Sequence, residues 1–196
     1  MAVSRPDWTL THEMVHLAFP NLTSDDHWAE EGLATYVEPL ARARLGTLSE
    51  DKVWSDLMEG VPKGMPQRGD RGLHGTKEWG RTYWGGALFW LLADMRIREQ
   101  TRNRRGLPDA LDGILDAGGD IRVRWDLLRT LAVADKAVGL TVLSDLYREM
   151  GRKPGAADLN DLWRRLGIGR ARGRVVYDNS APLAEVRRAI VSAPRH

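Results

Sequence analysis

Two histidines and a glutamate near the start of the chain have the types and spacing that could bind a metal ion. In the segment HEMVH, residues 12–16, the histidines are four positions apart. If Leu10–Phe19 is helical, His12 and His16 project from one face, one turn apart, and can reach the same ion. Glu13 lies beside them and can take a proton from an activated water. The segment matches the zinc-protease pentapeptide, although an amphipathic helix can contain such a match by accident.

A metal centre built on these histidines needs another ligand, since catalytic zinc takes three protein ligands and leaves the fourth position for water. The chain has no cysteine, so this ligand must be a histidine or a carboxylate. Glu30 and Glu31 lie on the next predicted helix, where neighbours point about 100° apart, so only one can face the ion. His27 and His74 are further candidates, but we expect neither to bind. Thr35 could support a ligand through its hydroxyl.

Two segments resemble the aminopeptidase N-like zinc peptidases, which are gluzincins. Residues 12–23 (HEMVHLAFPNLT) resemble the family's HELAHQWFGNLVT, and residues 28–36 (WAEEGLATY) resemble its WLNEGFATY. In that pattern the glutamate before the glycine is the third zinc ligand, which the resemblance places on Glu31. The two segments are closer together here than in the family. The missing residues fall in Ser24–His27, where a loop can shorten without moving either helix.

A third segment supports the same resemblance. Residues 79–88 (WGRTYWGGAL) are similar to the Tyr-Glu-Lys-Gly-Ala segment of these peptidases and to the Tyr-x-x-Gly-Gly-Ala-Leu form of the glycyl aminopeptidases. The family's tyrosine donates a hydrogen bond to the oxyanion of the tetrahedral intermediate, and the aligned residue is Tyr83. The three segments follow the family order in the first half of the chain. Leu159–Ile168 is a weaker match to the glycyl aminopeptidase C-terminus.

The resemblance implies a zinc-dependent peptide hydrolase with aminopeptidase-like action on peptides or proteins. His12, His16 and Glu31 would hold one Zn²⁺, Glu13 would act as general base, and Tyr83 would stabilise the oxyanion. The family's upstream β-domain, which binds the substrate amine, has no counterpart among these residues. We therefore expect the C-terminal helical part of a longer catalytic domain, with exopeptidase and endopeptidase action both open.

Composition is that of an ordinary globular chain. The 196 residues are 42% hydrophobic and 29% charged, which suits one domain with a buried core. No apolar run approaches the roughly 18 residues of a membrane span, and no signal-peptide pattern is visible. The sequence does not indicate a compartment.

Hydrophobic periodicity predicts an all-α fold, a multi-helix array around the zinc-binding helix pair. The resemblance makes this array a zincin-like helical lobe. Residues 1–100 would form the zinc-site half, residues 101–170 the supporting helices, and residues 171–196 a tail or a last helix. Met1–Thr9 would be an arm. Later helices are predicted at Pro108–Leu115, Trp125–Lys136, Thr141–Met150 and Asp158–Leu166, and Val175–Tyr177 is predicted as a lone strand.

Other local signals concern the elements around the site. Pro39 would break or kink the second helix, and Gly60–Thr76 reads as a long loop at the edge of the substrate cleft. The longest predicted helix is Lys77–Thr101. Within it, Gly85 and Gly86 lower the helix propensity. This cost is tolerable if the turn packs closely on the zinc helices, and such packing is needed to bring Tyr83 to the metal.

Two other functions stay open. A helical binding module would retain zinc and dock a partner chain or peptide without hydrolysis, because the absent β-domain leaves the cleft without its opposite wall. A nucleic-acid binder would use Arg102–Arg105 and Arg164–Arg174, which carry much of the excess positive charge in a chain of net charge +2. Such clusters are more often solvated helix ends, so nucleic acid is the weaker alternative.

Overall fold

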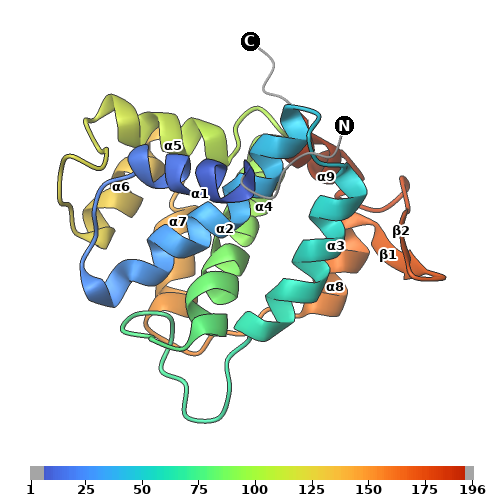
Figure 1. Ribbon diagram of the computed structural model, residues 1–196, viewed down its shortest axis with the longest axis horizontal. Coiled ribbons are helices and arrows are strands. Elements are labelled where there is room, and N and C mark those ends of the chain that lie inside the picture. Colours follow the sequence, from blue (N-terminus) through green and yellow to red (C-terminus); the bar gives the residue numbers. More distant parts are fainter. Residues whose placement is uncertain (1–6, 193–196) are drawn as a thin grey trace.

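The computed structural model describes residues 7–192. In this range the chain is mostly helical, with nine α-helices and one two-stranded antiparallel hairpin (Figure 1). The all-α prediction is therefore confirmed at this level, and the hairpin is an addition to it. The arm predicted at Met1–Thr9 is helical from Asp7 onward, and residues 1–6 lie outside the described range.

The two helices that carry the predicted ligands are α1 (Asp7–Leu17) and α2 (His27–Arg44). A short 3-10 turn at Ser24–Asp26 leads from the connecting loop into α2. The predicted break at Pro39 is wrong, because α2 continues through this proline to its end. Tyr36, one turn before Pro39, is completely buried, so packing on the core holds this part of the helix in place.

The helix α3 (Glu50–Gly60) begins where the Ser49 hydroxyl oxygen accepts a hydrogen bond from the backbone N–H of Lys52, at 3.2 Å. It continues into a 3-10 turn at Val61–Gly64, so the predicted loop Gly60–Thr76 starts with helical structure. The rest of that loop is fastened to a π-helical turn of the second half of the chain, Tyr147–Gly151, since the backbone N–H of Leu73 donates to the carbonyl of Met150 at 2.8 Å.

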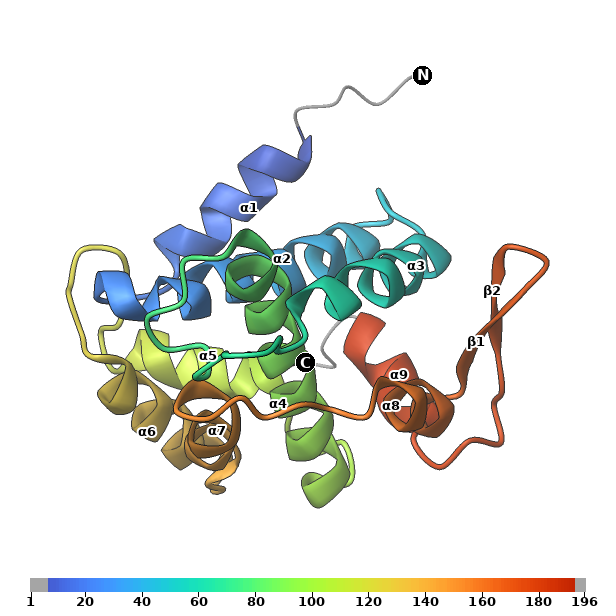
Figure 2. The same ribbon diagram turned by 90° about the horizontal axis from the view of Figure 1, so that it is seen from below.

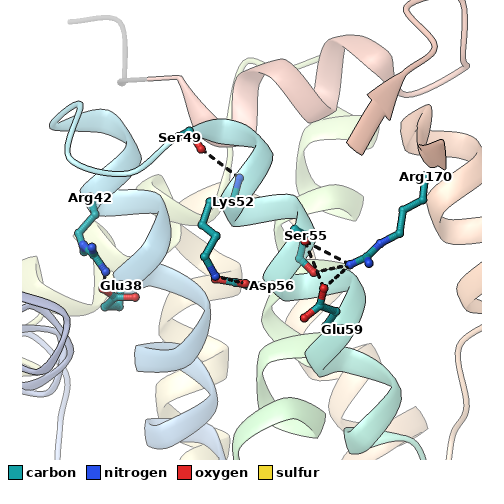
Figure 3. Close-up of polar contacts among 8 residues, drawn as sticks. All are labelled: Glu38, Arg42, Ser49, Lys52, Ser55, Asp56, Glu59 and Arg170. Atoms are coloured by element: carbon teal, nitrogen blue, oxygen red, sulfur yellow. Dashed lines mark hydrogen bonds and ion pairs between the residues drawn. The ribbon is translucent and has the colours of Figure 1, made fainter. Parts of the chain in front are cut away.

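The strand predicted at Val175–Tyr177 is not alone. It belongs to β2 (Arg174–Tyr177), which pairs antiparallel with β1 (Ile168–Ala171). Figure 3 shows Arg170 of β1 reaching across to Ser55 and Glu59 of α3, where its guanidinium lies 2.7 Å from the glutamate carboxylate. The hairpin therefore covers one side of α3.

The predicted helix Lys77–Thr101 begins at Trp79 and has two parts. Its first turns include a π-helical segment, Arg81–Gly85, and the regular helix α4 (Gly86–Thr101) follows. Most of α4 is buried on all sides, as expected for a helix at the centre of an array. The π-helical turn re-aims the side chains just before α4, including Tyr83.

Two glycines allow α2 and α4 to touch backbone to backbone. A Cβ atom on Gly32 would lie 2.3 Å from the Gly86 backbone, and a Cβ on Gly86 would lie 2.3 Å from the Trp28 carbonyl oxygen. No larger residue fits at either position without moving a helix. The expected close packing on the ligand-bearing helices is therefore confirmed for Gly86 on α2, whereas Gly85 packs against Leu73 and Gly64.

The second half of the chain surrounds α4, with α5, α6 and α7 on one side and α8, α9 and the hairpin on the other (Figure 2). The helices of this half are α5 (Leu107–Asp116), α6 (Leu127–Val138), α7 (Val142–Leu146) with a π-helical turn at Tyr147–Gly151, α8 (Leu159–Leu166) and α9 (Ala184–Val191). The segment 171–196 is thus more than a tail, since it contains β2 and α9, with buried Val186 and Ile190. Within residues 7–192, every helix is too short or too polar to cross a membrane.

A buried polar network joins α2, α4 and α5. The Asp94 carboxylate, 1% exposed, accepts hydrogen bonds from the Tyr36 hydroxyl at 3.0 Å, from Arg98 Nε at 2.7 Å and from the backbone N–H of Leu107 at 2.8 Å. Burial raises the pKa of Tyr36 well above its usual value, and the charge of Asp94 raises it further. Tyr36 therefore stays a neutral donor at any ordinary pH.

We expect Gly32→Ala to destabilise the fold by about 2 to 3 kcal/mol, because its methyl group would push α2 away from α4. Gly169→Ala is the matched control, since a Cβ there would lie 3.5 Å from Val176, an ordinary contact. Urea denaturation followed by circular dichroism measures both changes. Equal stability of the two variants would contradict the close helix contact.

We expect Asp94→Asn to cost about 3 to 5 kcal/mol, because it leaves Arg98 buried without its counter-charge. Asp161→Asn, which removes an ion pair between exposed side chains of α8, should change the free energy of unfolding little. The same denaturation experiment compares them. A small effect of Asp94→Asn would show that the network does not hold the three helices together.

Candidate metal centre

The structure brings together the three residues that the sequence predicts as metal ligands. His12 and His16 of α1 face Glu31 of α2, with 3.2 Å between His12 Nε2 and Glu31 Oε2 and 3.8 Å between His16 Nε2 and Glu31 Oε1. Ligand atoms of all three residues lie within 4.8 Å of one another. Glu31 is 9% exposed and both histidines are partly buried, so the group lies between the two helices.

These distances suit a tetrahedral ion. Zinc binds nitrogen and carboxylate oxygen at about 2.0 to 2.2 Å, so two ligand atoms of a tetrahedral site lie about 3.3 to 3.5 Å apart. The separation of 3.2 Å between His12 and Glu31 is close to this value, and His16 lies 3.8 Å from the other carboxylate oxygen of Glu31. Two imidazoles and one carboxylate are also the donor set of catalytic zinc sites with an open fourth position. The three residues therefore fit a zinc ion with only small side-chain movements.

Of the two neighbouring glutamates, only Glu31 faces the histidines of α1. Glu30 points elsewhere: its carboxylate accepts a hydrogen bond from the backbone N–H of Leu22 at 2.9 Å and lies 3.2 Å from His27 Nδ1. Glu30 thus fastens the loop between α1 and α2. This contact depends on the path of the loop, so helical periodicity alone could not assign the roles of the two glutamates.

The other histidines that the sequence offered have different surroundings. His74 lies 2.8 Å from the Asp26 carboxylate and ties the loop after α3 to the start of α2, away from the three ligands. His27 is exposed, but its Nε2 lies 3.3 Å from Glu31 Oε1. His27 and Glu31 are four residues apart on α2, a spacing that could have predicted this contact. Thr35 donates to the backbone carbonyl of Glu31 at 2.7 Å and does not touch its carboxylate.

Tyr83 reaches the same group from the π-helical turn before α4. Partial burial raises the pKa of its hydroxyl, and the charge of Glu31 together with a hydrogen bond to that carboxylate raises it further; Glu13 contributes least. Tyr83 is therefore a neutral donor beside the predicted ligands. Its ring stacks on the exposed Trp79, with ring centroids 5.6 Å apart.

The group opens into a cleft of about 760 Å³ that Glu13, an exposed residue of α1, also lines. Two exposed tryptophans that the sequence reasoning missed lie on its walls. Trp8 makes an edge contact with His12 at 6.2 Å, and Trp79 stacks on Tyr83. Each is four residues before its partner, so helical spacing could have placed both of them on the side of the site.

Two more carboxylates line the cleft, but each is paired within its own helix. Glu38 binds Arg42 of α2 at 3.0 Å, and Asp56 binds Lys52 of α3 (Figure 3). Their negative charges are therefore largely compensated. Among the carboxylates that line the cleft, Glu13 and Glu31 are the two with a predicted role in hydrolysis.

Comparisons with protein-family models, with curated proteins and with solved structures found no match to this chain. The likeness to the gluzincins therefore depends on the three short segments and on the geometry of their side chains.

We expect the purified protein to bind one zinc ion per chain. Glu31→Gln should lower zinc affinity by at least about tenfold, since the ligand charge is lost. Glu30→Gln is the matched control, because its amide oxygen can still accept from Leu22 N–H, and it should keep full occupancy. Metal content by emission spectrometry after dialysis measures both. Loss of zinc in Glu30→Gln with retention in Glu31→Gln would reverse the assignment.

Proposed function

We propose that this chain is a zinc-dependent peptide hydrolase, with aminopeptidase-like action and a zincin-like helical lobe. The observation that carries the proposal is the convergence of His12, His16 and Glu31 in a cleft that Glu13 and Tyr83 also line. A general base and an oxyanion donor beside a two-histidine, one-carboxylate ligand set are the parts that metal-assisted hydrolysis needs.

The zinc that these residues would hold supplies a water of lowered pKa and polarises the scissile carbonyl. The chain's own groups do the rest. The ligands come from two helices joined by a short loop that Glu30 fastens, so their positions are fixed before substrate arrives. Partial burial of all three ligands limits competition from solvent.

Glu13 would act as general base. It follows His12 directly, is exposed and lines the cleft, so its carboxylate can reach a water between itself and the substrate. It would accept the proton of the attacking water and then deliver it to the leaving amine. Since both transfers involve the same carboxylate, its loss should affect turnover far more than substrate binding.

Tyr83 would donate a hydrogen bond to the oxyanion of the tetrahedral intermediate. Its raised pKa keeps the proton on the hydroxyl at neutral pH. The stacking of Trp79 limits rotation of the Tyr83 ring and so helps to aim the hydroxyl.

A second candidate function is a zinc-retaining helical module that binds a partner without hydrolysis. One observation favours it: the outward side of α1 exposes Leu10 by 65% and both Met14 and Leu17 by 57%. Positions i, i+4 and i+7 form one stripe, which an upstream β-domain or a partner chain would cover. The two functions are compatible if the covering part completes the peptide-binding wall.

Turnover of fluorogenic peptides tests the hydrolase. We expect Glu13→Gln to lower kcat by about 10² to 10⁴ while zinc content stays at one per chain. Glu38→Gln, a change at another carboxylate of the same cleft, should leave kcat within a few-fold. Zinc-loaded protein that binds peptides but cleaves neither amino-acyl nor internally quenched substrates would favour the binding module instead.

Tyr83→Phe isolates the oxyanion donor, because it removes only the hydroxyl. We expect kcat to fall by about 10² to 10³ with little change in KM, the size of effect typical of a lost oxyanion-hole donor. Unchanged kcat in Tyr83→Phe would remove this residue from the mechanism without affecting the assignment of the metal ligands.

A further inference from the structure

A second cavity, of about 740 Å³, lies between the end of α4, the start of α5 and the last helix, α9. It shares no lining residue with the metal cleft. Arginines dominate its wall: Arg44, Arg98, Arg102, Arg104, Arg105 and Arg188. Cavities of this size suit small ligands, and this one is strongly basic.

The carboxylates nearby compensate only half of this charge. Arg98 pairs with Asp94, Arg105 with Asp109 and Arg188 with Glu185. The other three arginines, Arg44, Arg102 and Arg104, have no ion pair with a carboxylate among residues 7–192. The cavity lining therefore carries an excess of three positive charges, two of them on the exposed side chains of Arg102 and Arg104, where an anion from solvent can reach them.

Arg44, another residue of the cavity lining, supports this view. It donates to the carbonyl of Ile190 at 2.8 Å through one guanidinium nitrogen, whereas its Nε is buried and has no hydrogen-bond partner within the described chain. Burial lowers the pKa of Arg44; the nearby charges of Asp94 and Tyr36 raise it in part, and the charge of Arg98 adds the smallest decrease. A bound anion would further favour the charged guanidinium.

The turn that presents the other two unpaired arginines is held in an unusual backbone conformation. Arg102 and Asn103 have φ values of 53° and 58°, in the left-handed region that residues with a side chain rarely adopt. Hydrogen bonds fix the turn: Asn103 N–H donates to the Arg98 carbonyl at 2.8 Å, and Arg105 N–H donates to the Thr101 hydroxyl oxygen at 3.1 Å. Arg102 and Arg104 are thus presented by a fixed turn.

The second arginine cluster of the sequence, Arg164–Arg174, differs in how its side chains are paired. In it, Arg164 pairs with Asp161, Arg165 with Glu99 and Arg170 with Glu59. Arg172 and Arg174 of this cluster have no ion pair within residues 7–192, but they are exposed on the hairpin and line neither the metal cleft nor the arginine-lined cavity. The two clusters therefore do not form one continuous basic stripe of the kind that tracks a nucleic-acid backbone. The excess charge of Arg102–Arg105 is gathered in a cavity instead.

We propose that this cavity binds a small phosphate-bearing molecule, such as a phosphomonoester or a diphosphate. Guanidinium groups match phosphate oxygens with paired hydrogen bonds and keep their charge at all physiological pH values. Three unpaired arginines around one cavity suit a ligand of two to three negative charges. This site is separate from the proposed peptidase centre and does not depend on it.

Calorimetric titration of the zinc-loaded protein with inorganic pyrophosphate tests the proposal. We expect saturable binding with a Kd below about 1 mM. The double change Arg102→Gln with Arg104→Gln should weaken it by at least about tenfold. The matched control, Arg172→Gln with Arg174→Gln, removes two exposed arginines of the hairpin turn and should leave Kd within about twofold.

Two further titrations distinguish binding in this cavity from binding to zinc and from binding of nucleic acid. Pyrophosphate can also bind zinc, so His16→Ala, which weakens the metal centre, must keep the same Kd. A single-stranded oligonucleotide of twelve bases must not bind more tightly than pyrophosphate. The proposal is overturned by absence of binding, by equal Kd values in both double variants, by loss of binding in His16→Ala, or by oligonucleotide binding that the hairpin variant weakens.

Discussion

The contact between the backbones of α2 and α4 at Gly32 and Gly86 is the constraint on which the site depends. Glu31 directly precedes one of these glycines, and Tyr83 lies one turn before the other. The absence of two side chains thus brings a carboxylate and a phenol, 52 residues apart in sequence, to the same group of atoms. The indole N–H of Trp90 donates to the carbonyl of Ala29 at 2.9 Å and fixes the same crossing one turn further on.

The buried carboxylate of Glu31 requires compensating polar or positively charged neighbours. A carboxylate that is 9% exposed has lost most of its hydration, which is unfavourable unless positive or hydrogen-bonding groups replace the water. Imidazole nitrogens of His12, His16 and His27 lie 3.2 to 3.8 Å from its oxygens, and the Tyr83 hydroxyl interacts with the same carboxylate, which contributes to its raised pKa. A divalent cation would compensate the charge better than neutral imidazoles can. Placing it there would convert a costly buried anion into a ligand.

The two glutamates at positions 30 and 31 illustrate how far sequence reasoning reaches. Periodicity shows that only one of them can face α1, and the resemblance selects Glu31. The structural reason why Glu30 does not face α1 lies in the loop before α2, where the backbone N–H of Leu22 donates a hydrogen bond to the Glu30 carboxylate. Helix bounds were largely predictable because their apolar stripes are regular. Of the hairpin at Ile168–Tyr177, the strand at Val175–Tyr177 was predicted, but its partner β1 was missed because β1 is short and carries little hydrophobic pattern. The arginine cavity was not predictable, since α2, α4 and α9 meet there only in three dimensions.

X-ray absorption spectroscopy of the zinc-loaded protein tests the central claim most directly, because it reports the atoms around the ion regardless of activity. The geometry of His12, His16 and Glu31 predicts four light-atom neighbours at about 2.0 to 2.1 Å, two of them with the outer-shell scattering of imidazole. Substitution of either histidine should remove one imidazole contribution. A six-coordinate, all-oxygen shell, or an unchanged imidazole signal in both histidine variants, would contradict the proposed centre.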